Sequence, residues 1–392
     1  MKIIYYSPHP TLNLAAPSGP GTHMREVIAG FERAGHEVIP LILGGTKINQ
    51  EADIQISQSG TRKLTKKLLP ESVWQTIKDW NLRRFDRQVA QQKLAQLVDS
   101  EQPDLIYERG YYLMTSGVKV AKDKSVRHMI ELNAPYPEEK MQMEGLSYFV
   151  NKSNTCEYEQ VSMTDRVIVV SSALKDYLAD RYPTHTDKVY VTPNAVNRGK
   201  LRVDSTRVEE LRQEFSFSEC TILGFVGSIF PYHGVKELLE LFPELVPDYP
   251  KLRLLIVGDG AILGELKAFA KEKNIDNRIV FTGNVKHTDV PNHIDLMDIT
   301  IMPRSNWYGS PVKIFEYGLL NKAIIAPDNV PVRDVMENGQ DGILIPADQI
   351  AMKSAIKALI SDPATRKSMA ASFHNKVLEK YNWDKVVKTI LS

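Results

Sequence analysis

Short apolar segments alternate with amphipathic, helix-like segments along nearly the whole chain. This alternation is typical of α/β domains built on parallel sheets. The run Leu254-Leu-Ile-Val257 is apolar at every position, as expected for a strand that is buried on both faces. The predicted strands of the first half span residues 2–6, 37–41, 105–108, 127–132, 165–170 and 188–191, and those of the second half span residues 221–226, 252–257, 279–282, 299–302, 323–326 and 342–345.

The segment Thr192-Pro-Asn-Ala-Val-Asn-Arg-Gly199 lies between these two groups of strands. It is rich in turn-forming residues, which is typical of a linker. A chain of 392 residues also has room for two or three domains of roughly 150 residues each. We therefore predict an α/β protein of two Rossmann-like, doubly wound domains, residues 1–197 and 198–378. We expect a last helix, over about residues 379–392, that can pack back on the first domain.

Charge, cysteine content and the lack of long apolar runs indicate the partners and the cellular compartment of the chain. The formal net charge of +1 gives no basic footprint for nucleic acid. Cys156 and Cys220 are far apart and have no nearby cysteine or histidine partners, so a disulfide framework and a zinc cluster are excluded and a reducing cytoplasm is favoured. Pro8 comes too early for a signal sequence, and no apolar run approaches the roughly 18 residues needed to span a bilayer. We predict a cytoplasmic protein without a nucleic-acid partner.

Residues 62–87 predict a basic amphipathic helix that carries two tryptophans, Trp74 and Trp80. Such a helix can lie on an anionic membrane surface, here the inner face of the membrane. The alternative is an ordinary helix whose apolar stripe packs on its own domain. The basic residues are Arg62, Lys63, Lys66, Lys67, Lys78, Arg83, Arg84 and Arg87.

The segment from Asp298 to Gly318 is the most informative part of the sequence. A strand ends in a loop broken by proline and glycine, and a helix is expected to open with Ser310 as its N-cap and Pro311 at its first position. Lys313 and Glu316 are three residues apart and share one helical face. A cation suited to phosphate and a carboxylate suited to sugar hydroxyls predict a nucleotide-sugar site. The alternative is an ordinary strand–loop–helix with a solvated ion pair.

A second glycine-containing loop follows the first predicted strand. Gly19 and Gly21 allow the backbone to approach a ligand, and the next helix offers its N-terminus to a phosphate. His23 is either a ligand contact with a tentative catalytic role or a polar surface residue. The second half begins in the same way, with a strand, a glycine turn at Gly227 and a helix near Gly234.

Several other chemistries lack their motifs. Gly258 and Gly260 follow a strand, but the next glycine, Gly264, lies one residue beyond the dinucleotide-binding spacing. The sequence contains no Walker lysine motif, no Gly-x-Ser-x-Gly elbow and no His-Glu-x-x-His zinc motif. Hydride transfer, nucleotide hydrolysis, acyl transfer and zinc hydrolysis are therefore disfavoured.

Taken in order, segments along nearly the whole chain resemble the retaining glycosyltransferases of family four, which have the GT-B fold of two Rossmann-like domains facing each other across a cleft. The matching segments are Gly21-Thr-His-Met-Arg-Glu26, Ala34-Gly-His-Glu-Val38, Tyr107-Glu-Arg109, Glu131-Leu-Asn-Ala-Pro135, Val169-Val-Ser171, Thr192-Pro-Asn194, Phe225-Val-Gly227, Ile256-Val-Gly258-Asp-Gly260, Phe281-Thr-Gly283-Asn-Val285 and Ser310-Pro-Val-Lys313-Ile-Phe-Glu316.

The resemblance implies a role for each half. The second domain would bind a nucleoside-diphosphate sugar as co-substrate, with no other cofactor and no metal, and the first would bind a hydroxyl acceptor. Front-face substitution would retain the anomeric configuration without a protein nucleophile. The implied donor residues are Glu316 for the ribose, Asn284 and Val285 for the base, Gly227, Ser228, His233 and Lys313 for the diphosphate, Tyr308, Gly309 and Ser310 in the loop, and Gly19 and Gly21 from the facing domain; the acceptor-side residues are Glu108, Arg109, Glu131 and Asn133.

The sequence departs from the family pattern in three ways. Tyr308 stands near the place of a second glutamate, and Ser228 and His233 stand near the places of two basic residues. Lys313 can supply the missing positive charge. Asn133 replaces a histidine on the acceptor side. A non-catalytic nucleotide-sugar-binding subunit and a sugar-nucleotide epimerase of the same fold therefore remain alternatives to a transferase.

Overall fold

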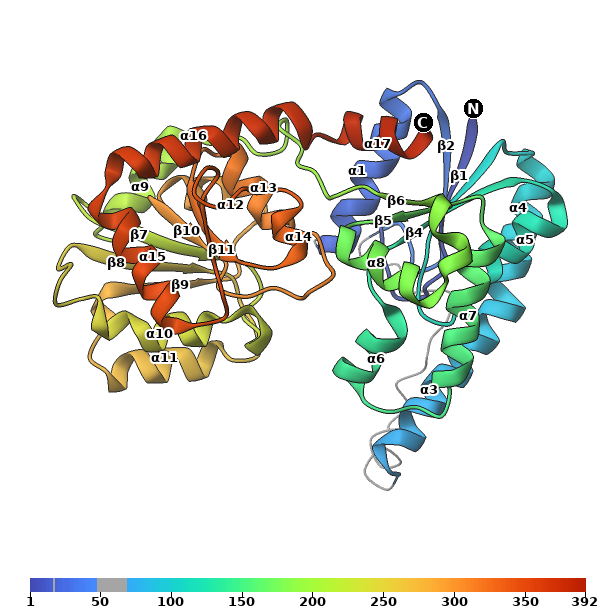
Figure 1. Ribbon diagram of the computed structural model, residues 1–392, viewed down its shortest axis with the longest axis horizontal. Helices are drawn as coiled ribbons and strands as arrows, with labels where there is room; N and C mark the ends of the chain where they lie inside the picture. The colour runs from blue at the N-terminus through green and yellow to red at the C-terminus, as the bar shows by residue number, and fades with distance from the viewer. Residues whose placement is uncertain (17, 48–68) are drawn as a thin grey trace. The chain divides into compact units, whose positions relative to one another are not determined.

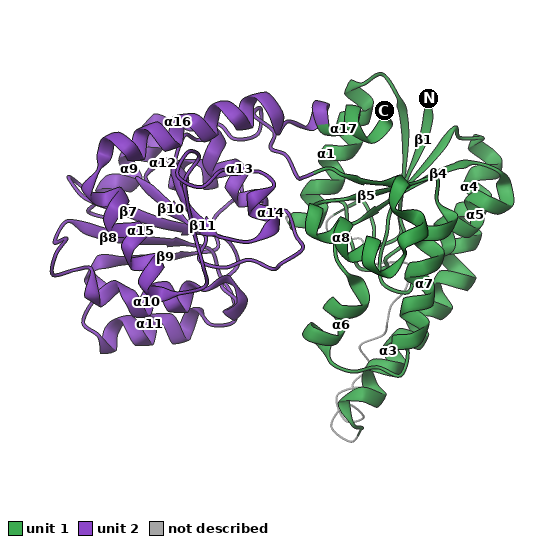
Figure 2. Cartoon of the chain, in the orientation of Figure 1, with its two compact units in different colours: residues 1–192, 386–392 green, residues 193–385 purple. Residues whose placement is uncertain are grey.

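The computed structural model describes residues 1–16, 18–47 and 69–392. The chain forms two compact units (Figure 2): unit 1 comprises residues 1–192 and 386–392, and unit 2 comprises residues 193–385. The first boundary falls after Thr192, and the second falls inside the last helix, α17 (Trp383–Leu391). Each unit contains one parallel six-stranded sheet with helices on both faces (Figure 1), so the predicted α/β fold class is confirmed.

The sheet of unit 1 has the strand order β2-β1-β3-β4-β5-β6. The order reverses direction between β1 and β3, which makes the carboxyl ends of these two strands the switch point where doubly wound sheets bind ligands. The strands are β1 (Lys2–Ser7), β2 (Glu37–Ile42), β3 (Leu105–Arg109), β4 (Arg127–Leu132), β5 (Arg166–Val169) and β6 (Val189–Val191), and the helices are α1 (Gly19–Arg33), α3 (Glu71–Phe85), α4 (Gln91–Glu101), α5 (Ser116–Lys124), α6 (Tyr136–Glu144), α7 (Val150–Met163) and α8 (Ser172–Arg181).

The sheet of unit 2 has the order β12-β11-β10-β7-β8-β9. Its switch point lies between β7 and β10. The strands are β7 (Thr221–Val226), β8 (Leu252–Val257), β9 (Ile279–Gly283), β10 (Ile299–Ile301), β11 (Ala323–Pro327) and β12 (Ile343–Ile345), and the helices are α9 (Ser205–Glu214), α10 (Val235–Leu241), α11 (Leu263–Glu272), α12 (Val290–Asp295), α13 (Val312–Leu319), α14 (Val330–Arg333), α15 (Gln349–Ser361) and α16 (Pro363–Lys380). All twelve strands lie within one residue of their predicted bounds.

Two apolar cores cover the opposite faces of the unit 2 sheet. Leu254 and Ile256 of β8 belong to one core, whereas Leu255 and Val257 of the same strand belong to the other. Successive side chains of a strand point to opposite faces. The continuous apolar run predicted to be buried on both faces is therefore buried on both faces in the structure.

Helix α1 begins earlier than the sequence suggested. We expected Gly19 and Gly21 in the loop before the helix, but both lie in its first turn, and the Ser18 hydroxyl accepts a hydrogen bond from the Gly21 amide. A Cβ atom on Gly21 would lie 2.4 Å from the carbonyl oxygen of Ala16. Gly21 is therefore required for close packing of the incoming loop against the helix.

Helix α3 packs with its polar side inward. Residues 62–68 of the predicted basic helix lie outside the described residues, and α3 covers Glu71–Phe85. Gln75, Asp79 and Arg83 are buried, whereas Ile77 and Trp80 are exposed. Phe85, at the end of the helix, is also buried, and Leu82 packs with it on an apolar core of unit 1, so this end of α3 packs on its own domain as the alternative expected. No helix within the described ranges has the length and apolar character needed to cross a membrane.

Candidate functional site

Three glycine turns meet at the carboxyl ends of β7, β8 and β9. Gly227, Gly258 and Gly283 all have positive φ angles, of 141°, 131° and 67°. The Gly227 amide donates to the Val257 carbonyl, and the Gly258 amide donates to the Gly283 carbonyl. A Cβ atom on Gly258 would lie 2.1 Å from the Gly227 carbonyl oxygen. Gly227 and Gly258 are therefore needed where these turns pack closely on each other at the end of the sheet.

Helix α13 brings Lys313 to the first of these turns. Lys313 Nζ lies 2.8 Å from the position that a Cβ atom on Gly227 would take, and 4.5 Å from the centroid of the Phe225 ring. The Nζ atom is buried and has no hydrogen-bond partner among the described residues. Its burial lowers the pKa of Lys313 to about 8, although Glu316 opposes this shift. A buried ammonium group without a partner is costly unless an anion pairs with it.

Glu316 lies one turn further along α13, on the same side of the helix as Lys313. Burial raises the pKa of its carboxyl group to about 7, and Lys313 opposes this shift. The next residue, Tyr317, is fully buried, and its hydroxyl accepts a hydrogen bond of 2.9 Å from the Val226 amide at the end of β7. This bond anchors α13 to the strand that carries the glycine turn.

The start of α13 differs from the prediction. Pro311 is the N-cap, and no side chain caps the helix. The Ser310 hydroxyl instead accepts a hydrogen bond of 3.0 Å from the Asn194 amide, while the Asn194 side chain donates to the Ser310 carbonyl at 2.7 Å. Ser310 therefore ties the loop before α13 to the segment that begins unit 2.

The remaining predicted donor residues lie on loops at this end of the sheet. His233 donates a hydrogen bond from Nδ1 to the Ser228 carbonyl, and burial and Lys313 lower the pKa of its imidazole to about 4. Tyr308 is buried, and the Gly309 amide donates to the Asn306 side chain at 2.7 Å. Asn284 and Val285 directly follow β9, with Asn284 exposed and Val285 half-buried.

In unit 1, four predicted residues meet at the switch point. Arg109 donates to Glu131 at 2.8 Å and lies 3.1 Å from His23 Nδ1. The Asn133 side chain and the Tyr107 hydroxyl also donate to the Glu131 carboxylate, at 2.5 and 2.7 Å. Arg109, Glu131 and His23 are all buried.

The charges of this cluster follow from its contacts. Burial favours a raised pKa for Glu131, but His23, Arg109 and the hydrogen bonds from Asn133 and Tyr107 hold it below its ordinary value. Burial lowers the pKa of His23 to about 4, although Glu131 opposes this shift. At neutral pH the cluster therefore holds a carboxylate, a guanidinium and a neutral imidazole whose Nδ1 accepts the hydrogen bond from Arg109.

Glu108 does not join this cluster. Neighbouring side chains of β3 alternate between faces, and Glu108 contacts His128 Nε2 at 3.0 Å on the face opposite to Arg109. A Cβ atom on Gly117 would lie 1.9 Å from Glu108 Oε2, so α5 packs tightly over this carboxylate. We find that Glu108 lies in the packing between the sheet and α5 and not beside His23.

Sequence reasoning missed three residues that shape the site in unit 2. Tyr317 anchors α13, Phe225 lies under Lys313, and Asn194 holds the Ser310 loop. Tyr317 directly follows Glu316, but the adjacency gives no sign that its hydroxyl reaches β7. Phe225 and Asn194 lie in segments quoted for the resemblance, yet their partners are about 90 or more residues away in the sequence.

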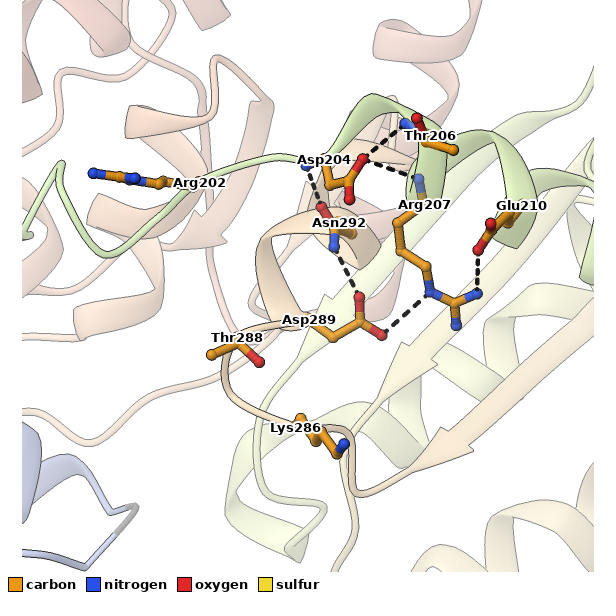
Figure 3. Close-up of a pocket in the computed structure, with 9 residues that line it drawn as sticks. All are labelled: Arg202, Asp204, Thr206, Arg207, Glu210, Lys286, Thr288, Asp289 and Asn292. Atoms are coloured by element: carbon orange, nitrogen blue, oxygen red, sulfur yellow. Dashed lines mark hydrogen bonds and ion pairs between the residues drawn. The ribbon is translucent and has the colours of Figure 1, made fainter.

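A polar hollow of about 430 Å³ lies elsewhere in unit 2 (Figure 3). Asp204 caps α9, and Arg207 pairs with Glu210 and Asp289 across the hollow. These charges already have partners within the hollow, and none of the predicted donor residues lines it. In residues 1–16, 18–47 and 69–392, no three or more histidine, cysteine or carboxylate side chains gather as a metal site would require; the predicted metal independence stays a prediction.

Comparison with known protein families shows to which family the chain belongs. A model of glycosyltransferase family 4 matches residues 17–200, and a model of group 1 glycosyl transferases matches residues 207–374. Between them they cover most of both units. The chain belongs to the group 1 glycosyltransferases. The Gly227 turn, Lys313 and Glu316 of this group 1 chain fall inside the second match, and His23, Arg109 and Glu131 fall inside the first.

The relatives of this chain are glycosyltransferases with different names. An α-D-kanosaminyltransferase of Streptomyces kanamyceticus is 27% identical over 45% of this chain and 46% of its own length. A GDP-mannose-dependent phosphatidylinositol monomannoside mannosyltransferase of Mycobacterium tuberculosis is 23% identical over 56% of this chain and 59% of its own length. The chain thus aligns with about half of the length of these relatives.

Solved structures show that this group 1 chain has the GT-B fold. HepE of Anabaena, solved with UDP, is 15% identical and superposes with a TM-score of 0.76 over 100% of this chain and 98% of that chain. Sucrose-phosphate synthase of Thermosynechococcus elongatus is 16% identical, with a TM-score of 0.71 over 99% of this chain and 96% of that chain. The predicted two-domain architecture is therefore confirmed.

Proposed function

We propose that this chain is a retaining glycosyltransferase that moves a sugar from a nucleoside-diphosphate sugar to a hydroxyl acceptor. We assign donor binding to unit 2 and acceptor binding to unit 1. The observation that carries the proposal is the buried Lys313 ammonium, which has no hydrogen-bond partner among the described residues and lies against the Gly227 turn. A diphosphate supplies the anion that this group lacks.

Each donor residue has a defined part in this proposal. Lys313 stabilises the negative charge that develops on the departing diphosphate, and the open backbone near Gly227 approaches the phosphate oxygens. The Glu316 carboxylate accepts hydrogen bonds from the two vicinal hydroxyls of the ribose. Each carboxylate oxygen can accept from one of these hydroxyls. The proposal involves no protein nucleophile and no metal, as the family resemblance implies.

Uridine is the base to test first. Anabaena HepE has been solved with UDP and with UDP-glucose, and it shares the fold of this chain. Asn284 and Val285 follow β9 in the turn assigned to the base. Thermal unfolding should be followed with uridine, guanosine, adenosine and thymidine diphosphates, because a ligand that binds only the folded state raises its stability.

In unit 1, we assign the acceptor hydroxyl to the cluster of His23, Arg109, Glu131 and Asn133. The Glu131 carboxylate can accept a hydrogen bond from a hydroxyl, and the neutral His23 imidazole, whose Nδ1 accepts from Arg109, holds the guanidinium beside it. Peripheral contact with an anionic membrane at the inner face is also part of the proposal.

Glu316→Ala provides the decisive test. Transfer, measured as release of nucleoside diphosphate in the presence of acceptor, should be abolished while the unfolding temperature changes little. Glu272→Ala, which removes an exposed carboxylate of α11, is the matched control and should retain activity. Full activity in Glu316→Ala would remove the proposed ribose contact.

A second candidate is a subunit that binds the nucleotide sugar without turning it over. Ser228 carries no charge, and the low pKa of His233 leaves its imidazole neutral at neutral pH. Lys313 is therefore the one cation among the five residues that we assign to the diphosphate and the ribose. Calorimetry with the preferred nucleotide, followed by product analysis with and without acceptors, separates the two candidates. Sugar isomerisation without acceptor would instead indicate an epimerase.

A further inference from the structure

The ring of Phe225 lies at the point where Lys313 meets the Gly227 turn. A Cβ atom on Gly227 would be 2.8 Å from Lys313 Nζ and 3.6 Å from Phe225 Cζ. The Nζ atom itself is 4.5 Å from the centroid of the Phe225 ring. A ring face attracts a cation within about 6 Å of its centroid. The ring is therefore placed to attract the Lys313 ammonium.

The helix and the ring belong to opposite faces of the unit 2 sheet. Phe225 is fully buried in one apolar core of the unit, whereas Ile314 and Phe315 of α13 belong to the core on the other face. Lys313 therefore passes the end of β7 to reach the ring. It does so beside Gly227, where the lack of a side chain leaves room for the ammonium.

Glu316 and His233 are titratable neighbours of this ammonium. Glu316 favours the protonated form of Lys313, but burial raises the pKa of Glu316 itself to about 7, so its negative charge is incomplete at neutral pH. The His233 ring centroid lies 6.1 Å from that of Phe225, and its pKa of about 4 leaves it neutral. Burial of Lys313 opposes its charge. A contact that attracts only the charged form therefore matters at this position.

We propose that Phe225 is a positioning residue for the transfer reaction: its ring face holds the Lys313 ammonium at the Gly227 turn before the diphosphate binds. The inference rests on the proposed function, in which Lys313 binds that diphosphate. A lysine side chain loses rotamer freedom when it is fixed, and a side chain that the ring already holds loses less of it on binding. A neutral amine is not attracted to the ring face, so the ring also favours the charged form.

Titration of Lys313 in the free protein tests the contact directly. With lysine labelled with 13C at Cε, the NMR signal that is missing from Lys313→Met identifies Lys313, and its shift reports protonation between pH 6 and 10.5. In Phe225→Leu the midpoint should move about one pH unit toward neutral, because a desolvated cation–π contact favours the charged form about tenfold. This measurement needs no nucleotide, so its result is separate from that of the proposed function.

A second variant keeps the shape of the ring. Phe225→3,5-difluorophenylalanine withdraws electron density from the ring face and leaves Cζ unchanged. Its midpoint should lie between those of the parent and Phe225→Leu, and it provides the test if Phe225→Leu folds poorly. The same midpoint in the parent and in both variants would overturn the proposal and leave Phe225 a member of the apolar core alone.

Binding of uridine diphosphate links the contact to the reaction. In Phe225→Leu the affinity should fall about fivefold at pH 8 and little at pH 6.5, since the charged fraction of Lys313 differs between parent and variant mainly at the higher pH. A loss of packing alone would weaken binding equally at both pH values, and that result would overturn the proposal. Shifted midpoints in a parent that binds no nucleoside diphosphate would support the contact and refute the proposed function.

Phe242→Leu is the matched control. Phe242 is fully buried in the same apolar core as Phe225, but it follows α10 and does not lie at the Gly227 turn. This variant should lose stability to urea as Phe225→Leu does, while the Lys313 midpoint and the pH dependence of uridine diphosphate binding stay as in the parent. An equal shift of the midpoint in Phe242→Leu would assign the effect to the core and overturn the proposal.

Discussion

Lys313 lies against Gly227: its Nζ atom is 2.8 Å from the point where a Cβ atom on that glycine would stand. One residue comes from a helix and the other from a strand end, and 86 positions separate them in the sequence. The contact places a buried ammonium beside open backbone at the switch point of unit 2. A methyl group at Gly227 would therefore affect both the turn and the cation.

Gly227→Ala should abolish nucleotide binding and cost about 1–3 kcal/mol of unfolding free energy, because φ is 141° there and the methyl group displaces Lys313. Gly264→Ala is the control: nothing lies within 4 Å of its added Cβ atom, and stability should stay equal or rise by about 0.5 kcal/mol. Calorimetry and urea unfolding measure both effects. Tight nucleotide binding by Gly227→Ala would contradict the assignment of this turn to the diphosphate.

Nucleotide affinity should fall as the pH rises above about 8. The pKa of Lys313 is lowered to about 8 in the free protein, so the ammonium loses its proton there while the diphosphate is already fully ionised. The affinity should drop by up to about tenfold per pH unit if the positive charge is required. Titrations at pH 7 to 9.5 measure this. Lys313→Met should bind weakly with no such pH dependence, and a parallel slope in that variant would assign the effect to another group.

Removing the Glu131 carboxylate should strongly destabilise unit 1. Glu131→Ala leaves the buried Arg109 guanidinium without its carboxylate partner, which costs about 3–5 kcal/mol. Glu219→Ala removes one partner of an exposed pair with Lys251, whose side chains are 82% and 70% exposed, and should cost less than about 1 kcal/mol. Urea unfolding compares the two. Equal costs would show that the Arg109–Glu131 cluster is solvated in solution.

His23 should make the chain sensitive to mild acid. Its pKa is lowered to about 4 in the folded protein, so between pH 6.5 and 4 the unfolded chain binds a proton that the folded chain does not, and stability falls as the pH falls. Glu157 and Glu316, with pKa values raised to about 7, act in the opposite direction over pH 7 to 4.5. The test therefore compares the free energy of unfolding of the parent and of His23→Gln at each pH. The variant should lose less stability than the parent between pH 6.5 and 4.

If the difference in unfolding free energy between the parent and His23→Gln does not change between pH 6.5 and 4, the His23 imidazole is protonated at its ordinary pKa. A protonated imidazole cannot accept the hydrogen bond from Arg109, so the proposed place of His23 in the acceptor site would be lost.

The order of strands and helices could be predicted from the sequence because the apolar segments of buried parallel strands are continuous and are bounded by glycine and proline. The position of Lys313 and Glu316 on one face of a helix could also be predicted from their spacing in the sequence. The start of α13 did not, because Ser310 bonds to Asn194, more than a hundred positions away, and this contact competes with capping.

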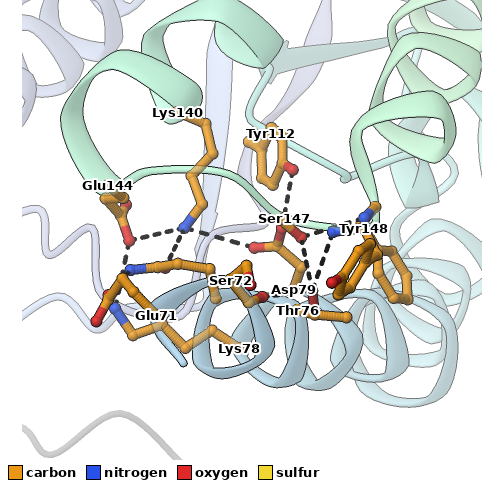
Figure 4. Close-up of polar contacts among 12 residues, drawn as sticks. Glu71, Ser72, Thr76, Lys78, Asp79, Tyr112, Lys140, Glu144, Ser147 and Tyr148 are labelled. Atoms are coloured by element: carbon orange, nitrogen blue, oxygen red, sulfur yellow. Dashed lines mark hydrogen bonds and ion pairs between the residues drawn. The ribbon is translucent and has the colours of Figure 1, made fainter. Parts of the chain in front are cut away.

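The tertiary structure alone decided which polar residues meet. Strand alternation separates Glu108 from Arg109, but only the docking of α1 over β3 and β4 brings His23 to Arg109 and Glu131. For α3, the sequence showed an amphipathic helix and could not show which side faces inward. Burial of Asp79 and Arg83 depends on partners from distant segments, namely Tyr112, Lys140 and Thr115. Figure 4 shows the contacts of Asp79 with Tyr112 and Lys140. These charges are buried on the helix that also packs Phe85 on the apolar core.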